Sequence, residues 1–163
     1  MSAVVQHFWI MFILGIVANG LTWKWRSKKY IAENPELQEG YDRLIKGYLI
    51  FGNIPWVIVG IGMVTGMTKS MSDFFNPGQL NPIVIAFLLV VIVEWMLGIY
   101  WIFFNGGAET LVKHPGLFTS SAKGNEKFET MKVKLLWIVA VLGGILGIAL
   151  MIWKMNVLVD TIS

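Results

Sequence analysis

The sequence predicts an all-α, polytopic membrane protein with four transmembrane helices in an antiparallel bundle and short interfacial helices in the cytoplasmic loops. Composition is the first reason: of 163 residues, 56% are hydrophobic and only 14% are charged, against about 25% charged in an average soluble domain. Distribution is the second, since four apolar stretches stand out, at about residues 3–23, 47–67, 82–104 and 135–153. Each approaches the roughly 20 residues that a membrane-spanning helix needs. We expect one transmembrane domain over residues 1–163.

The first apolar stretch contains no Asp, Glu, Lys or Arg. It has neither the positively charged start nor the small-residue cleavage pattern of a secretory signal, so we expect it to be retained as a span. Smaller and more polar residues recur along it at helical spacing, which predicts that this face packs inward. The face consists of Phe8, Met11, Gly15, Ala18, Asn19, Thr22 and Arg26.

A charged segment separates the first two spans. Its basic residues nearest the membrane are expected to meet anionic lipid headgroups; they are Lys24, Arg26, Lys28 and Lys29. The run Asn34-Pro35-Glu36 is typical of a helix start, with asparagine as the cap. Apolar residues then recur at positions 37, 41, 44, 45 and 48, which predicts an interfacial amphipathic helix that continues into the second span. Such a helix either supports the bundle or binds a partner.

Pro55 lies within the second stretch and predicts a kink, because proline removes a backbone donor and clashes with the preceding turn. Asn53 and Trp56 share one helical face, whereas Gly62 and Gly66 lie on the opposite face. The spacing of the two glycines is typical of close helix packing. Two separate packing faces fit either an oligomer or a position inside the chain's own bundle.

The third stretch starts at Asn81-Pro82, which predicts a capped helix, and ends at Asn105-Gly106-Gly107, which predicts a helix terminus. A short helix is expected at Ala108–Lys113, and further turn and cap signals are Asn76-Pro77-Gly78 and Asn125. Small residues in the fourth stretch form one flat face that another backbone can approach closely. They are Ala140, Gly143, Gly144 and Gly147.

Basic residues set the expected orientation. Eleven of the Lys and Arg residues lie in segments 24–46 and 113–134, and two lie elsewhere, Lys69 and Lys154. The positive-inside rule therefore predicts that both charged segments are cytoplasmic and both termini extracytoplasmic. We expect a multi-pass protein of the bacterial inner membrane, surrounded by lipids.

Glu94 lies at the centre of the third stretch, and an ionisable group there is costly enough to mark a candidate site. Counting about 1.5 Å per residue from the cytoplasmic ends puts Trp56 and Glu94 at about 14–15 Å and Asn53 at about 9 Å. Antiparallel spans would bring the three to similar depths. We expect a hydrogen bond to Glu94 from the Trp56 indole or the Asn53 amide.

Three roles for Glu94 remain open. It can anchor two helices as a protonated hydrogen-bonding group, bind or relay a cation or proton through a pore or carrier, or act as an acid or base in an intramembrane enzyme. The anchor leads, and the enzyme ranks last, since no nucleophile–base pair, metal-ligand cluster or phosphate loop is recognisable. An enzyme would best use Arg26, Lys28, Lys29, Glu33 and Arg43 around an anionic substrate.

Other residue types narrow the chemistry further. The chain has no cysteine, which excludes disulfides, thiol redox chemistry and thiolate metal sites. His7 precedes the first span and His114 lies in a polar loop, so one chain cannot assemble the bis-histidine site of a membrane haem. We expect no cofactor, no metal and no nucleic-acid partner.

Several short motifs lie in the polar segments and at the span ends: RSKKYI, NPEL, GY and GNIPW in the first half, WIFFNGGAE and KHPGLF in the second. This pattern resembles a family of small uncharacterised bacterial four-span membrane proteins over most of the chain. The resemblance implies the four-span architecture and assigns no activity to any residue. The expected function is that of a non-enzymatic structural or accessory subunit in a homo-oligomer or a larger membrane complex. The alternative is an oligomeric ion channel or proton-linked transporter that uses Glu94.

Overall fold

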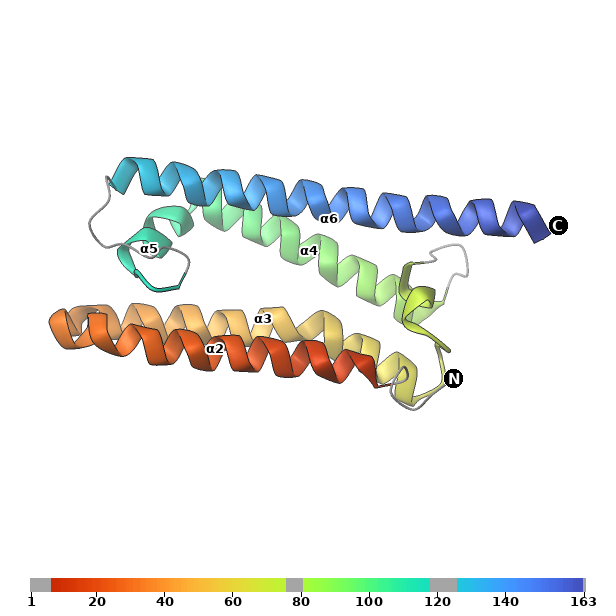
Figure 1. The fold of residues 1–163 in the computed structure, drawn as a ribbon, viewed down its shortest axis with the longest axis horizontal. Helices are drawn as coiled ribbons and strands as arrows, with labels where there is room; N and C mark the ends of the chain where they lie inside the picture. The colour runs from red at the N-terminus through yellow and green to blue at the C-terminus, as the bar shows by residue number, and fades with distance from the viewer. Residues whose placement is uncertain (1–6, 76–80, 118–125, 163) are drawn as a thin grey trace.

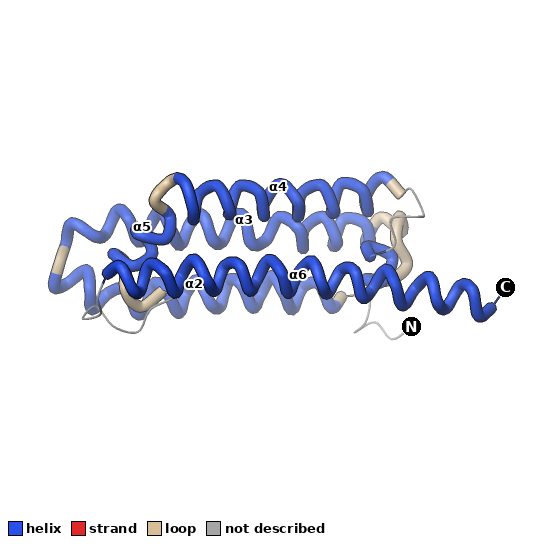
Figure 2. Tube along the Cα trace, turned by 90° about the horizontal axis from the view of Figure 1, so that it is seen from above, coloured by secondary structure: helices blue, strands red, loops and turns tan. Residues whose placement is uncertain are grey.

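The structure is a computed structural model that describes residues 7–75, 81–117 and 126–162, and its regular elements in these ranges are all helices (Figure 2). The expected turn Asn76-Pro77-Gly78 and the expected cap Asn125 lie outside the described residues. In chain order the elements are α2 (Phe8–Glu33), the 3-10 helix η1 (Pro35–Leu37), α3 (Gln38–Val64), the 3-10 helix η2 (Met71–Phe75), α4 (Pro82–Phe104), α5 (Gly107–Lys113) and α6 (Glu126–Ile162).

Four segments are long and apolar enough to cross a membrane: α2, the η1–α3 run, α4, and residues 129–150 of α6. The predicted all-α, four-helix membrane fold is therefore confirmed. Helices suit this environment, because in lipid a helix satisfies its backbone hydrogen bonds within its own segment.

The long helices form two antiparallel pairs, α2 with α3 and α4 with α6, and α3 also packs on α4 (Figure 1). Residues 24–46 and α5 lie at one end of the molecule, which we call the charged end. α2 begins and α6 ends at the opposite, terminal end. The chain thus runs up and down through the bundle, with residues 24–46 and α5 on one side.

α2 and α6 are longer than the stretches predicted as spans. They contain 26 and 37 residues, or about 39 Å and 55 Å of helix against a hydrocarbon core of about 30 Å. The α2–α3 pair projects beyond α6 at the charged end, and α6 projects beyond the other helices at the terminal end (Figures 1 and 2). The span limits inside these helices stay predictions.

The inward face of α2 differs from the predicted one. Its buried residues are Gly20, Trp23 and Ser27, whereas the predicted face is mostly exposed, with Met11 at 62%. A Cβ at Gly20 would lie 2.6 Å from a methyl carbon of Leu49, so α3 approaches α2 at this glycine. The prediction was wrong because spacing shows which residues share a face, but not how the helix is rotated against its neighbours.

Two asparagines expected to cap helices behave differently. Asn81 caps α4 as predicted, since its Oδ1 accepts from the Ile83 backbone N–H at 3.1 Å and its Nδ2 donates to the Met67 carbonyl at 2.6 Å. Asn34 makes no side-chain cap. It is instead the C-cap of α2 and is followed directly by the 3-10 helix η1, so the connection between α2 and α3 is short.

The predicted amphipathic face at the start of α3 is buried at the charged end. Tyr41 and Ile45 form a core cluster with Trp23 of α2 and Leu117, which follows α5. The Tyr41 hydroxyl donates to the Pro115 carbonyl at 2.7 Å. The face is therefore covered by other parts of the chain, which supports the bundle-supporting alternative for this helix.

Candidate functional site

Asn53 of α3 and Glu94 of α4 each lie one helical turn from a residue that packs against the same buried cluster. Further toward the terminal end, Val59 of α3 and Phe87 of α4 belong to one buried cluster, against which Trp56 and Val91 also pack. One helical turn from Trp56 and Val91 toward the charged end lie Asn53 and Glu94. Because residues three apart share a helical face, both follow the packed stripes of their helices.

Each of these two side chains has a buried oxygen without a hydrogen-bond partner among the described residues, namely Asn53 Oδ1 and Glu94 Oε1. The other end of the asparagine amide is occupied, since Nδ2 donates to the Leu49 carbonyl at 2.7 Å. A buried acceptor without a donor costs about 1–3 kcal/mol. Neither oxygen therefore accepts a hydrogen bond from the described chain.

Trp56 does not serve as that donor. Its ring stacks on Phe12 of α2, with centroids 3.8 Å apart and an interplanar angle of 2°. In the described part of the chain, the expected hydrogen bond from Trp56 or Asn53 to Glu94 is not formed. Depth counting gives the level of a side chain but not its direction, and the direction here is set by the aromatic contact with α2.

Pro55 lies inside α3, which continues through it from Gln38 to Val64. Proline cannot donate to the carbonyl one turn earlier, which belongs to Phe51. The predicted kink stays a prediction.

The glycine faces pack only in part as predicted. A Cβ at Gly62 would lie 2.8 Å from the Phe74 ring, so this glycine admits η2 closely. Gly66 does not pack, since it follows the end of α3 with a φ of +71° and has open space around it. Its left-handed backbone ends the helix, a role that glycine spacing alone does not reveal.

On α6 the predicted flat face is divided. Gly144 packs on the indole of Trp95 from α4, where an added Cβ would lie 2.7 Å from Cζ2. A Cβ at Gly143 or Gly147 would meet no atom within 4 Å, and Ala140 is exposed. Within the described chain this part of the face is open.

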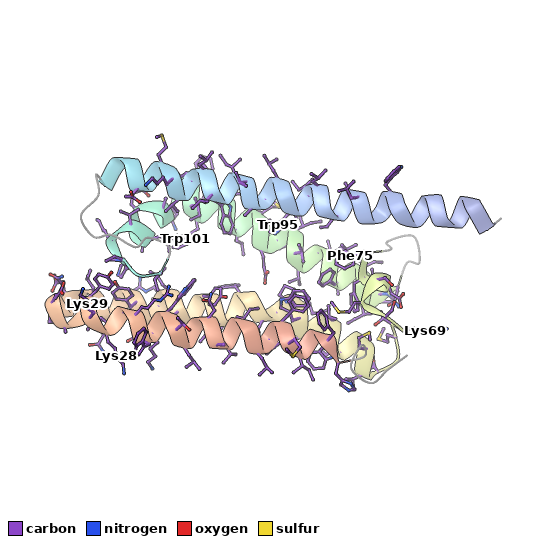
Figure 3. The ribbon with its side chains drawn as sticks, in the orientation of Figure 1. Lys28, Lys29, Lys69, Phe75, Trp95 and Trp101 are labelled. Atoms are coloured by element: carbon purple, nitrogen blue, oxygen red, sulfur yellow. The ribbon has the colours of Figure 1, made fainter. Side chains whose placement is uncertain are left out.

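Contacts between tryptophans and glycines of the facing helix were not predicted from the sequence. The α4–α6 contact is reciprocal: Trp95 of α4 lies on Gly144 of α6, and Trp137 of α6 lies on Gly98 of α4. Trp95 projects from the middle of α4 (Figure 3). Three-residue spacings place Trp95 and Gly98 on one face, which is the signal that could have suggested the contact.

The basic residues of the charged end are exposed as expected for contacts with headgroups: Lys24, Arg26, Lys28 and Lys29. Figure 3 shows Lys28 and Lys29 at the opposite end of the molecule from Lys69. Nearby, Lys134 of α6 and Glu109 of α5 form an ion pair at 3.1 Å. The pKa of Glu109 lies below its ordinary value, first because its own backbone N–H bonds the carboxylate and then because of Lys134.

His114 is a packing residue at the charged end. Its Nδ1 lies 2.7 Å from the Thr110 carbonyl, its ring meets the Tyr41 ring edge to face, and its Nε2 side lies against Gly40 of α3. Among residues 7–75, 81–117 and 126–162, no group of three or more His, Asp or Glu side chains could hold a metal ion.

Comparison with known proteins finds no match, since no protein-family model, no curated protein and no solved structure is similar to this chain.

Proposed function

We propose that this multi-pass membrane protein is a structural or accessory subunit of an assembly in the bacterial inner membrane, either a homo-oligomer or a larger complex. The observation that supports this role is the open small-residue face of α6, formed by Ala140, Gly143 and Gly147. In lipid, where apolar surface alone does not drive association, small residues permit the close backbone approach that holds helices together. The neighbouring Gly144 is already covered by Trp95.

The chain suits a direct test of this face because it contains no cysteine. Single Gly143→Cys and Gly147→Cys variants in native membranes should form oxidative cross-links to a second copy or to another subunit. Ile145→Cys is the control, since Ile145 is 50% exposed on a different side of α6. Native mass spectrometry in mild detergent should give the same composition as the cross-links. A single chain by mass, with no cross-link from either glycine position, would rule out the proposal.

The proposed orientation places the charged end in the cytoplasm and both termini outside, supported by the excess of basic residues at that end. A membrane-impermeant maleimide applied to intact cells should label Lys69→Cys, while Lys28→Cys should react only after lysis. Both positions are exposed. The reverse labelling pattern would invert the topology.

A second candidate function is an oligomeric ion channel or proton-linked transporter that uses Glu94. It is favoured by the buried, unpartnered Oε1 of this carboxyl. Glu94→Gln keeps a hydrogen-bonding side chain but cannot ionise. Ion or proton flux in proteoliposomes that is lost in Glu94→Gln would support transport, whereas no flux in the wild type, or equal flux in both, would exclude it.

A further inference from the structure

Glu94 has no countercharge in the spans of its own chain. Outside Glu94 itself, the stretches 8–23, 47–68, 82–104 and 135–153 contain no Asp, Glu, Lys, Arg or His. An ionised carboxylate at this depth would thus be both desolvated and unpaired, which is among the most costly states for a side chain in a membrane. Some species other than a basic side chain must neutralise it.

The hydrogen bonds of Asn53 and Glu94 indicate which chemical group the neutralising species must supply. A carboxylate only accepts hydrogen bonds, and an amide oxygen only accepts. Asn53 Oδ1 and Glu94 Oε1 are both buried and both without a donor in the described chain, while Asn53 Nδ2 is held by the Leu49 carbonyl. The amide is therefore fixed with its acceptor free. One hydrogen on the carboxyl group would turn Glu94 into the donor that this pair lacks.

A metal ion fits the pair less well than a proton. Hard cations such as Ca²⁺ and Mg²⁺ take about six or more oxygen ligands, and α3 and α4 offer only two unpartnered side-chain oxygens at this level. The described residues also contain no group of three carboxylate or imidazole ligands. The local chemistry thus favours the smallest cation, which needs one oxygen to bind and a second to receive its hydrogen bond.

From this arrangement we infer that Glu94 binds a proton within the membrane and that its O–H is donated to Asn53 Oδ1, directly or through one water. The step is a simple equilibrium: the carboxylate gains a proton to form one O–H bond and releases the same proton when it ionises. The inference goes beyond an accessory role. It also sharpens the transport candidate, on whose site it rests, by naming the proton as the bound species and Asn53 as the positioning residue.

Infrared spectroscopy of the full chain in lipid vesicles tests the inference, because a protonated carboxylic acid has a C=O stretching band that a carboxylate lacks. At neutral pH the wild type should show this band, and Glu94→Gln should lose it. Asn53→Ala removes the acceptor and should shift the band. Asn19→Ala is the matched control, since the Asn19 amide instead donates to the Tyr48 hydroxyl at 3.0 Å in the α2–α3 contact.

A second measurement needs no variant. A hydrophobic carbodiimide reacts with protonated carboxyl groups in apolar surroundings, so mass spectrometry of the labelled wild type should find the adduct on Glu94. Absence of both the band and the adduct at neutral pH would overturn the inference. A band unmoved in Asn53→Ala would overturn the role of Asn53, and a band abolished by Na⁺ or K⁺ would assign the site to a metal cation. Flux is measured separately, so a protonated Glu94 without flux refutes transport alone.

Discussion

A methyl group added at Gly144 tests the contact that joins α4 to α6. The new Cβ would lie 2.7 Å from Cζ2 and 2.9 Å from Cη2 of Trp95. Ordinary contacts begin at 3.4 Å, so the rigid indole would have to retreat by about 0.7 Å. Gly47→Ala is the matched control, since Gly47 is also helical and a Cβ there would meet no atom within 4 Å.

Both substitutions gain the same helix propensity, up to about 1 kcal/mol. Only Gly144→Ala also overpacks a contact, at a cost of about 1–3 kcal/mol. We therefore expect Gly144→Ala to be less stable than Gly47→Ala by about 1–3 kcal/mol. The difference between the two variants isolates the contact with the indole from the intrinsic effect of alanine.

Thermal unfolding in detergent, followed by tryptophan fluorescence, measures this difference. Trp95→Leu removes the ring atoms that the methyl group would meet, so in a double-mutant cycle the Gly144→Ala penalty should largely disappear. Equal melting temperatures for Gly144→Ala and Gly47→Ala would refute the packing argument. A penalty that persists without the Trp95 ring would assign the effect to the backbone of α6 instead.

Three further predictions concern the charged end. Tyr41→Phe removes a buried hydroxyl that donates at 2.7 Å and should lower the free energy of unfolding by about 1–3 kcal/mol. The control Tyr100→Phe changes an exposed ring and should alter this free energy by less than about 0.5 kcal/mol. Unfolding in detergent compares the two variants. Gly116→Ala places a side chain at a φ of +88° and 2.8 Å from an aromatic ring of α2, so hydrogen exchange of residues 107–117 should accelerate. Because the pKa of Glu109 is lowered in the folded state, this carboxylate adds stability at pH values above its unfolded-state pKa of about 4.3. That stability is lost as the pH falls through the folded-state pKa, so Glu109→Gln should flatten the acid side of the stability profile. The effect should be less than about 1 kcal/mol, because the ion pair with Lys134 is partly exposed.

Each of these three predictions can be contradicted by a specific result. If Tyr41→Phe and Tyr100→Phe were equally stable, the hydroxyl bond would contribute nothing to the charged end. Unchanged exchange in Gly116→Ala would mean that the turn after α5 tolerates a side chain, and an unchanged acid profile in Glu109→Gln would mean that the carboxylate is not stabilised in the folded state.

Patterns that depend on neighbours along the chain were predictable. The bounds of α4 at Pro82 and Phe104 agree with the expected stretch, and the Asn81 cap is formed as expected. The buried face of α3 around Tyr41 and Ile45 also follows from its spacing. These features rest on local rules, namely capping, proline placement and helical periodicity, which act over a few residues.

Contacts between helices were harder to predict. The face of α2, the Trp56–Glu94 hydrogen bond and the packing role of Gly66 were all inferred from spacing, and the structure assigns them differently. In each case the side chain could have packed on more than one neighbouring helix. Periodicity shows which residues share a face, but the partner for that face depends on how neighbouring helices are rotated.

By itself the sequence determined the number of membrane-crossing helices, their antiparallel order and the position of one carboxyl, Glu94, at the centre of the third, because hydrophobic length and the cost of a buried charge act within one segment. Only the tertiary structure decided that Trp56 lies against Phe12 and that Trp95 and Trp137 cover glycines of the facing helices. The physical reason is that close packing is a property of two surfaces together, so the fit of an indole on a glycine appears only when both helices are in place.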